Sequence, residues 1–138
     1  MTTLEAARRW AETWRRAWQA LDVEAVVALY APGTHYSSAP FREPYRGVEG
    51  AREYVGQAFG EERDVQAWFS EPIVAGDRAS VSWWASLWEQ GDEMTLAGTS
   101  VLRFDAAGLV VDQWDSWDLQ PGRREPPSGW GPFTAPSP

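Results

Sequence analysis

The 138-residue sequence contains no cysteine. Disulfides, thiolate metal sites and a cysteine nucleophile are therefore excluded, and the fold has to be stabilised by packing. Histidine is almost as scarce: His35 is the only one, which excludes a zinc site built from several imidazoles. No glycine-rich phosphate-binding loop occurs either. The sequence thus predicts neither a metal nor an organic cofactor.

Basic residues are also few, and long apolar runs are absent from the sequence. Twelve basic against twenty acidic residues give a net charge of −8, which repels nucleic acid and anionic membranes. No apolar stretch approaches the roughly 18 residues of a membrane span. The first residues lack the basic and then apolar pattern of a secretory signal. We therefore expect a cytoplasmic protein that binds neither nucleic acid nor membranes.

Tryptophan is the residue in excess, with ten copies. Between residues 4 and 21, apolar side chains recur at spacings of three and four while arginines occupy the other side. This pattern predicts an amphipathic helix whose tryptophan stripe faces the interior. The stripe consists of Ala7, Trp10, Trp14, Trp18 and Leu21.

Two further helices are predicted in the first half of the chain. Asp22 is a suitable N-cap for a short helix that continues through residues 26–29 and is ended by Pro32-Gly33. Residues 35–40 form a short extended segment. A third helix is expected from about residue 48 to residue 60, where a glycine can stop it.

The chain from residue 64 to residue 119 has the pattern of strands and turns. Residues 64–74 alternate weakly and are followed by a turn. Residues 80–88 alternate with the odd-numbered side chains inward, and residues 95–104 with the even-numbered ones inward. A turn at residues 105–108 leads into the last strand. The sequence therefore predicts an antiparallel meander.

The last strand carries a carboxylate where a hydrophobe is expected. Its more apolar face consists of Leu109, Val111, Gln113, Asp115 and Trp117. If this face points inward, Asp115 must be paired, hydrated or protonated. Such a group can be a general base in a lined pocket.

The alternative role for this carboxylate is structural. Asp115 then forms an ion pair with an arginine such as Arg42 or Arg46, or accepts hydrogen bonds from loop amides.

Three helices followed by a meander predict an α+β domain over residues 1–119. In this architecture a curved antiparallel sheet wraps around the long N-terminal helix, with a cone-shaped pocket between them. Residues 120–138 hold six of the ten prolines and are expected to form an irregular tail. Trp130 and Phe133 are expected to attach part of this tail to the domain.

Several short segments resemble the nuclear transport factor 2-like superfamily, and within it SnoaL-like proteins most. They are Asp22-Val-Glu-Ala-Val-Val-Ala-Leu-Tyr30, Ser38-Ala-Pro40, Arg46-Gly47, Ser100-Val-Leu-Arg-Phe-Asp105 with Gly108, and Trp117. The resemblance covers roughly residues 5–119. It implies a cone-shaped fold with a deep pocket, often dimeric through the sheet. The superfamily includes ketosteroid isomerases, limonene epoxide hydrolases, polyketide cyclases and non-catalytic binding modules, so the fold alone does not select a function.

The residues of a ketosteroid isomerase site are missing. That site needs a tyrosine and a protonated aspartate as oxyanion donors, and a second aspartate as the base. Ungapped matching places Trp14, Ser100 and Ala39 at these positions. Ordinary ketosteroid isomerisation is therefore not expected.

The limonene epoxide hydrolase pattern is half present. Its water-holding positions match Tyr36, Ser38 and Asp115. Its arginine and second acid fall near Val81 and Trp83, which cannot donate a proton in the same way. The resemblance thus implies a water-activating base without the usual acid.

Together these observations predict a SnoaL-like protein that binds a small, largely apolar organic molecule in a tryptophan-lined pocket. An enzyme is slightly favoured: a cofactor-independent hydrolase, hydratase, isomerase or cyclase, with Asp115 as base and Tyr36 and Ser38 as positioning groups. The alternative is a non-catalytic binding or dimerisation module whose cone is plugged by side chains. The remaining predicted ligand-binding residues are Trp14, Trp18, Trp83, Ser100, Gln113, Trp117 and His35.

The outward face of the sheet is unusually aromatic. Alternation places Trp84, Trp88 and Trp114 on it. An exposed apolar patch of this kind is typical of an interface. We therefore expect a homodimer formed through this face.

Overall fold

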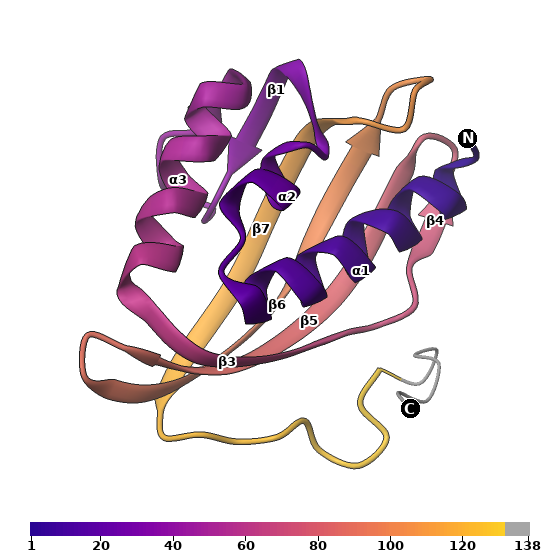
Figure 1. The fold of residues 1–138 in the computed structure, drawn as a ribbon. Helices are drawn as coiled ribbons and strands as arrows, with labels where there is room; N and C mark the ends of the chain where they lie inside the picture. The colour runs from indigo at the N-terminus through magenta and orange to yellow at the C-terminus, as the bar shows by residue number, and fades with distance from the viewer. Residues whose placement is uncertain (132–138) are drawn as a thin grey trace.

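The N-terminal helix, α1 (Thr3–Ala20), begins at a capping box. The Thr2 hydroxyl accepts the Glu5 amide at 3.1 Å, and the Glu5 carboxylate accepts the Thr2 amide at 2.7 Å. The helix ends at Leu21, whose φ of 55° is left-handed. Ala7 and the three tryptophans of its stripe are buried and Leu21 is half-buried, which confirms the predicted orientation. The computed structural model that establishes this fold describes residues 1–131 (Figure 1).

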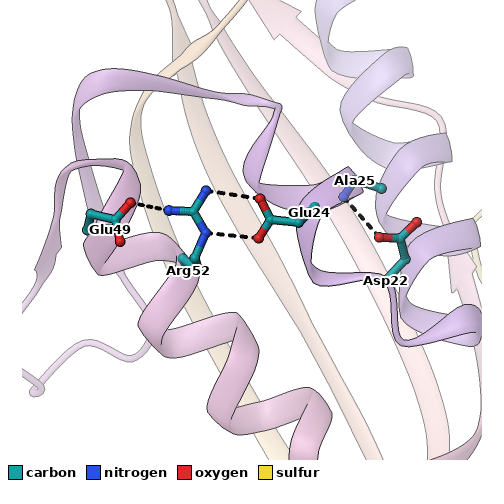
Figure 2. A network of polar contacts seen from close by, with 5 residues as sticks. All are labelled: Asp22, Glu24, Ala25, Glu49 and Arg52. Carbon is teal, nitrogen blue, oxygen red and sulfur yellow. Dashed lines mark hydrogen bonds and ion pairs between the residues drawn. The ribbon is translucent and has the colours of Figure 1, made fainter.

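One arginine links the two shorter helices through ion pairs. Asp22 caps α2 (Val23–Val27) by accepting the Ala25 amide at 3.2 Å, as predicted. Arg52 of α3 (Gly47–Glu61) donates to both carboxylate oxygens of Glu24 in α2, at 2.9 and 3.0 Å. It also pairs with Glu49 one turn earlier (Figure 2). This bidentate contact links α2 to α3 at the protein surface.

A seven-stranded sheet follows the order β2-β1-β7-β6-β5-β3, with β4 paired to β5. The strands are β1 (Tyr30–Ser37), β2 (Tyr45–Arg46), β3 (Glu62–Phe69), β4 (Ile73–Ala75), β5 (Arg78–Glu89), β6 (Asp92–Phe104) and β7 (Val110–Pro121). All three helices lie on one face of the curved sheet (Figure 1). The α+β architecture is therefore as predicted. Among the residues described, no helix has the length and apolar character needed to cross a membrane.

Two details of the sheet differ from the prediction. The sheet is mixed, because β1 pairs with β7 in parallel while the other pairs are antiparallel. The second helix also ends earlier than expected, and Pro32-Gly33 lies inside β1. A proline is tolerated there because the register between β1 and β7 is irregular between Tyr30 and His35.

Strand alternation is confirmed for β5 and β6 and partly for β7. Val81, Trp83, Ala85 and Leu87 of β5 are buried. In β7, Gln113 and Asp115 are buried while Trp114 is exposed. The start of β7 was predicted wrongly: Val110 is buried, and Leu109 and Val111 are only half-buried. The reason is a bulge, since Phe104 pairs with Val110 whereas Arg103 pairs with Asp112.

After β7 the chain returns across the outer face of the sheet. The Arg124 carbonyl accepts the Trp84 indole N–H at 2.8 Å, and the Trp130 ring packs edge-on against Trp84 with centroids 6.2 Å apart. Trp130 thus attaches this segment to the domain, as expected; Phe133 lies outside the described residues. Trp84 is half-buried by its own chain, whereas Trp88 is 38% and Trp114 50% exposed.

Candidate functional site

A cavity of about 330 Å³ lies between the helices and the inner face of the sheet. Helix α1 contributes a row of indoles, α3 contributes Tyr54 and Phe59, and β5, β6 and β7 supply the opposite wall. Five tryptophans line it: Trp10, Trp14, Trp18, Trp83 and Trp117. The cone is therefore not plugged, although most of its wall is aromatic.

The structure brings most of the predicted site residues to this one cavity. The residues that line it are Tyr36, Trp14, Trp18, Trp83, Ser100, Gln113, Asp115 and Trp117. They come from α1 and four strands, and inward alternation is what places the strand residues together. His35 and Ser38 do not line the cavity.

His35 lies on the opposite face of the sheet. Its ring packs against Trp114 with centroids 4.7 Å apart, and its Nδ1 atom lies 4.0 Å from the Asp112 carboxylate. Because Tyr36 points inward, its neighbour on the strand must point outward. The predicted contact between His35 and a pocket ligand therefore has no support in this geometry.

Ser38 is displaced for a different reason. Strand β1 ends at Ser37, so Ser38 no longer follows the alternation that would put it beside Tyr36. Its side chain is fully buried, and its hydroxyl has no partner among residues 1–131. Its carbonyl instead accepts the Trp117 indole N–H at 2.6 Å. Ser38 thus orients a cavity wall through its backbone rather than through its hydroxyl.

Asp115 is held by hydrogen bonds and by no cation. Its Oδ1 atom accepts the Ser100 hydroxyl at 2.6 Å and the Gln113 amide at 3.0 Å, and the Tyr36 hydroxyl is a third donor to the carboxyl group. Burial raises the pKa of Asp115 to about 7, and these hydrogen bonds offset part of that rise. The expected alternative of an ion pair with Arg42 or Arg46 is wrong, since no residue between 1 and 131 pairs with this carboxylate.

Both donors to Oδ1 are themselves oriented by aromatic side chains. The Trp83 indole donates to the Ser100 hydroxyl at 3.0 Å, which leaves the hydroxyl proton for Asp115. The Tyr30 hydroxyl donates to the Gln113 carbonyl oxygen at 2.5 Å, which turns the amide nitrogen toward Asp115. Tyr30 in turn accepts the Trp14 indole at 3.1 Å. This network fixes the carboxylate in one position.

Glu62 is a second buried carboxyl group in the same cavity. It is 7% exposed, and its Oε1 atom accepts the Trp18 indole N–H at 2.7 Å. Burial raises its pKa to about 7, the Trp18 hydrogen bond opposes the rise, and Glu89 and Glu61 add to it. Two carboxyl groups that titrate near neutral pH therefore share one aromatic cavity, and each can accept or donate a proton there.

Sequence reasoning missed Glu62 because of an irregular strand start. Asp64 has a left-handed φ of 52°, and the pairing of β3 with β5 shifts register between Arg63 and Gln66. Glu62 is consequently out of phase with the inward residues that follow.

The residues described offer no site for a metal ion. No group of three or more His, Asp or Glu side chains within residues 1–131 is arranged to hold one.

Comparison with known proteins gives a family match and a shared fold. Residues 8–113 match the family model of the SnoaL-like domain. RV0760c from Mycobacterium tuberculosis is 17% identical with a TM-score of 0.75, over 88% of this chain and 100% of that one. The epoxide hydrolase/cyclase-like enzyme SalBIII, described in pyran ring formation in the polyether salinomycin, is 15% identical with a TM-score of 0.75, over 86% and 96%.

An NTF2-like protein of unknown function from Exiguobacterium sp. 255-15 is 17% identical with a TM-score of 0.67, over 82% of this chain and 98% of that one. No curated protein matches the chain. At these identities the solved structures establish the shared fold, and the activity has to be argued from this chain's own residues.

Proposed function

Since the chain belongs to the SnoaL-like domain family, we propose that it binds a small, largely apolar organic molecule in its aromatic cavity and acts on it by acid/base catalysis. One observation carries the proposal. Asp115 is buried in the wall of a cavity of about 330 Å³, held by three donors, with its pKa raised to about 7. Perturbed carboxyl groups of this kind cluster at functional sites.

In this proposal Asp115 is the base. Near neutral pH about half of its population is ionised, so it can take a proton from a bound water or from an acidic C–H. The Tyr36 hydroxyl remains protonated because burial, followed by the charge of Asp115, raises its pKa. Tyr36 therefore acts as a donor beside the base. Ser38 is left out, because its hydroxyl does not face the cavity.

Glu62 supplies the acid that the sequence comparison lacked. It lines the same cavity, and its protonated form can donate to a leaving or developing oxygen. Hydrolysis, hydration, isomerisation and cyclisation all fit a base and an acid in one apolar cavity.

The competing function is a binding module without catalysis. One version of this alternative is a module whose cone is filled by side chains. The open cavity argues against that version, because a volume of about 330 Å³ accommodates a small molecule. Ligand binding without turnover would support a non-catalytic binding module.

The test begins with a thermal-shift screen of small apolar epoxides, enones and lactones, followed by product analysis of every hit. A ligand at 100 times its Kd should add about 2.7 kcal/mol of stability. Asp115→Asn should lower kcat by roughly 10²- to 10⁴-fold while ligand still binds. Asp118→Asn is the matched control, because it lies on the same strand but is exposed on the other face. Unchanged turnover in Asp115→Asn would remove this residue from the mechanism.

We also propose that the protein forms a homodimer through the outer face of the sheet. Trp88 and Trp114 are 38% and 50% exposed, which is unusual for tryptophan on a free surface. The chain's own segment of residues 122–131 covers the middle of this face at Trp84, so the proposed interface includes that segment. Sedimentation velocity at micromolar concentration should give a dimer; a monomer would contradict the proposal.

A further inference from the structure

The charges around the cavity are almost all negative. Asp115, Glu61, Glu62 and Glu89 line it, and Arg42 is the only cationic side chain that does so among residues 1–131. Neither Asp115 nor Glu62 forms an ion pair with any residue in this range. Buried carboxylates are normally paired with a positive charge. The described protein does not supply one.

The aromatic wall has no free indole donor. Trp10 and Trp14 donate to the Tyr30 hydroxyl, Trp18 to Glu62, Trp83 to Ser100, and Trp117 to the Ser38 carbonyl. All five cavity indoles are therefore satisfied within the protein. What they present to a ligand is ring carbon, and the electron-rich face of an indole ring attracts cations.

An anionic ligand would meet the opposite conditions. Its charge would be repelled by the four carboxyl groups, and the indoles could not donate to it. A neutral apolar ligand fits the rings but leaves the two buried carboxylates without a counter-charge. A cation attached to an apolar body satisfies both features of the cavity.

We propose that the ligand of this cavity is a small organic cation, such as a tertiary or quaternary amine on an apolar body, whose positive charge lies between the tryptophan rings and the carboxylates of Glu62 and Asp115. This inference rests on the proposed function in one respect, namely that the cavity is the ligand site. It adds the class of ligand, and it assigns Glu62 as a specificity-determining residue.

The proposal has a measurable consequence for protons. Both carboxyl groups have pKa values near 7, so each is partly protonated in the empty cavity at neutral pH. A bound cation favours the ionised forms. Cation binding should therefore release up to about one proton, whereas a neutral ligand of the same shape should release none.

The experiment compares three probes of nearly equal shape: choline, its neutral isostere 3,3-dimethylbutan-1-ol, and the anion 3,3-dimethylbutanoate. Binding is followed by intrinsic tryptophan fluorescence, and proton release by calorimetry in two buffers of different ionisation enthalpy. Choline should bind at least ten-fold more tightly than the alcohol and release protons on binding. The anion should bind most weakly.

Variants of the full-length chain show whether the carboxyl groups are responsible. Glu62→Gln should weaken choline binding about ten-fold and leave binding of the alcohol unchanged, and Asp115→Asn should act in the same direction. Glu93→Gln is the control, because Glu93 is exposed and does not line the cavity. Circular dichroism checks that each variant is folded.

The outcomes separate this inference from the proposed function. Equal affinities for choline and the alcohol, or a choline affinity unaffected by Glu62→Gln, would overturn the inference while leaving an apolar binding cavity. Failure of all three probes, together with failure of the wider apolar screen, would overturn both.

Discussion

At the scale of single residues, Asp115 is the group whose ionisation weakens the fold. Burial raises its pKa from 3.8 to about 7, so the folded protein binds this proton more tightly than the unfolded chain does. The stability contributed by the proton is fully present below about pH 4 and is lost as the pH rises through about 7. The slope in that window is near 1.4 kcal/mol per pH unit for one group.

Asp115→Asn should therefore flatten the pH dependence of stability. The free energy of unfolding of the native chain should fall between pH 5 and pH 7. In the variant this decrease should be smaller by the contribution of one carboxyl group. Urea unfolding at pH 5, 6, 7 and 8 measures it. Asp118→Asn, exposed on the other face, should keep the native slope. A native slope in Asp115→Asn as well would show that the carboxyl group is ionised throughout this range.

Tyr30 is the positioning residue behind Asp115. Tyr30→Phe would remove the acceptor of the Trp14 indole and the donor to the Gln113 carbonyl oxygen. Buried polar groups left without a partner cost about 1–3 kcal/mol, so the variant should be destabilised by that amount. The Gln113 amide would then be held only by the Trp10 indole at 3.3 Å, and with its bond to Asp115 less firmly positioned the pKa of Asp115 should rise further. Urea unfolding and a pH titration of stability report both effects.

The matched control is Tyr45→Phe. Tyr45 also lines the cavity, but its hydroxyl takes part in none of the hydrogen bonds around Asp115. Equal effects of the two substitutions would contradict a special role for Tyr30.

The site residues that could be predicted are mainly those whose inward orientation follows from strand alternation. Alternation placed Gln113 and Asp115 inward, the family resemblance placed Tyr36 at the pocket, and all three are buried. Glu62 could not be found that way, because the left-handed Asp64 breaks the alternation after it. The hydrogen-bond partners of the indoles could not be predicted from the sequence either, since Tyr30 and Trp14 meet only when α1 lies over the inner face of the sheet.

At the scale of elements, the tight pairing of β6 with β7 depends on Gly98. A Cβ atom added there would lie 2.3 Å from the Ser116 carbonyl oxygen and 2.5 Å from the Trp117 Cβ atom. Neither contact can be relieved by rotating a flexible side chain, because both involve the backbone region of β7. The two strands would have to separate next to the cavity wall that Trp117 forms.

Gly98→Ala should consequently destabilise the protein by about 1–3 kcal/mol, as overpacking of a close-packed interior does. It should also weaken the binding of any ligand in the cavity, since Trp117 would move. Gly33→Ala is the control, because Gly33 also lies in a strand but has no atom within 4 Å of an added Cβ. Chemical unfolding compares the two variants, and similar losses of stability would refute the argument.

Elements with strong local signals were predictable, and those defined by distant pairing were not. The caps at Thr2 and Asp22 and the tryptophan stripe give α1 and α2 clear starting points, and each meander turn follows from nearby residues. The parallel pairing of β1 with β7 joins segments 77 to 80 residues apart, from Tyr30 against Val110 to Ser37 against Trp114. No local pattern encodes such a pairing, and the sheet was predicted as wholly antiparallel for that reason.

At the scale of the whole molecule, the segment of residues 122–131 acts as an internal cover for the sheet. The Gly122 and Arg124 amides and the Gly122 carbonyl are tied to Glu93 and Thr95 of β6, and Arg124 and Trp130 cover Trp84 of β5. Trp84 is level with Asp118 of β7, because both pair with Ala97 of β6. Trp114 lies four residues before Asp118 on β7, and Trp88 lies four residues after Trp84 on β5, which runs in the same direction as β7 because both are antiparallel to β6. Along the strand direction, Trp84 is therefore between the exposed Trp88 and Trp114. Removing the cover would expose the Trp84 indole on the same face of the sheet as Trp88 and Trp114.

A chain ending at Pro121 should therefore self-associate at least ten-fold more strongly than one ending at Gly131, which keeps the described cover. The driving force is burial of the indole surface that Trp130 no longer protects. Sedimentation velocity across a concentration series measures the association constant, and circular dichroism verifies that both chains fold. Trp130→Ala in the full-length chain should move in the same direction by a smaller factor, since the Arg124 contact to Trp84 remains. Identical association constants for the two truncated chains would mean that this segment does not limit contact between the outer faces of two sheets.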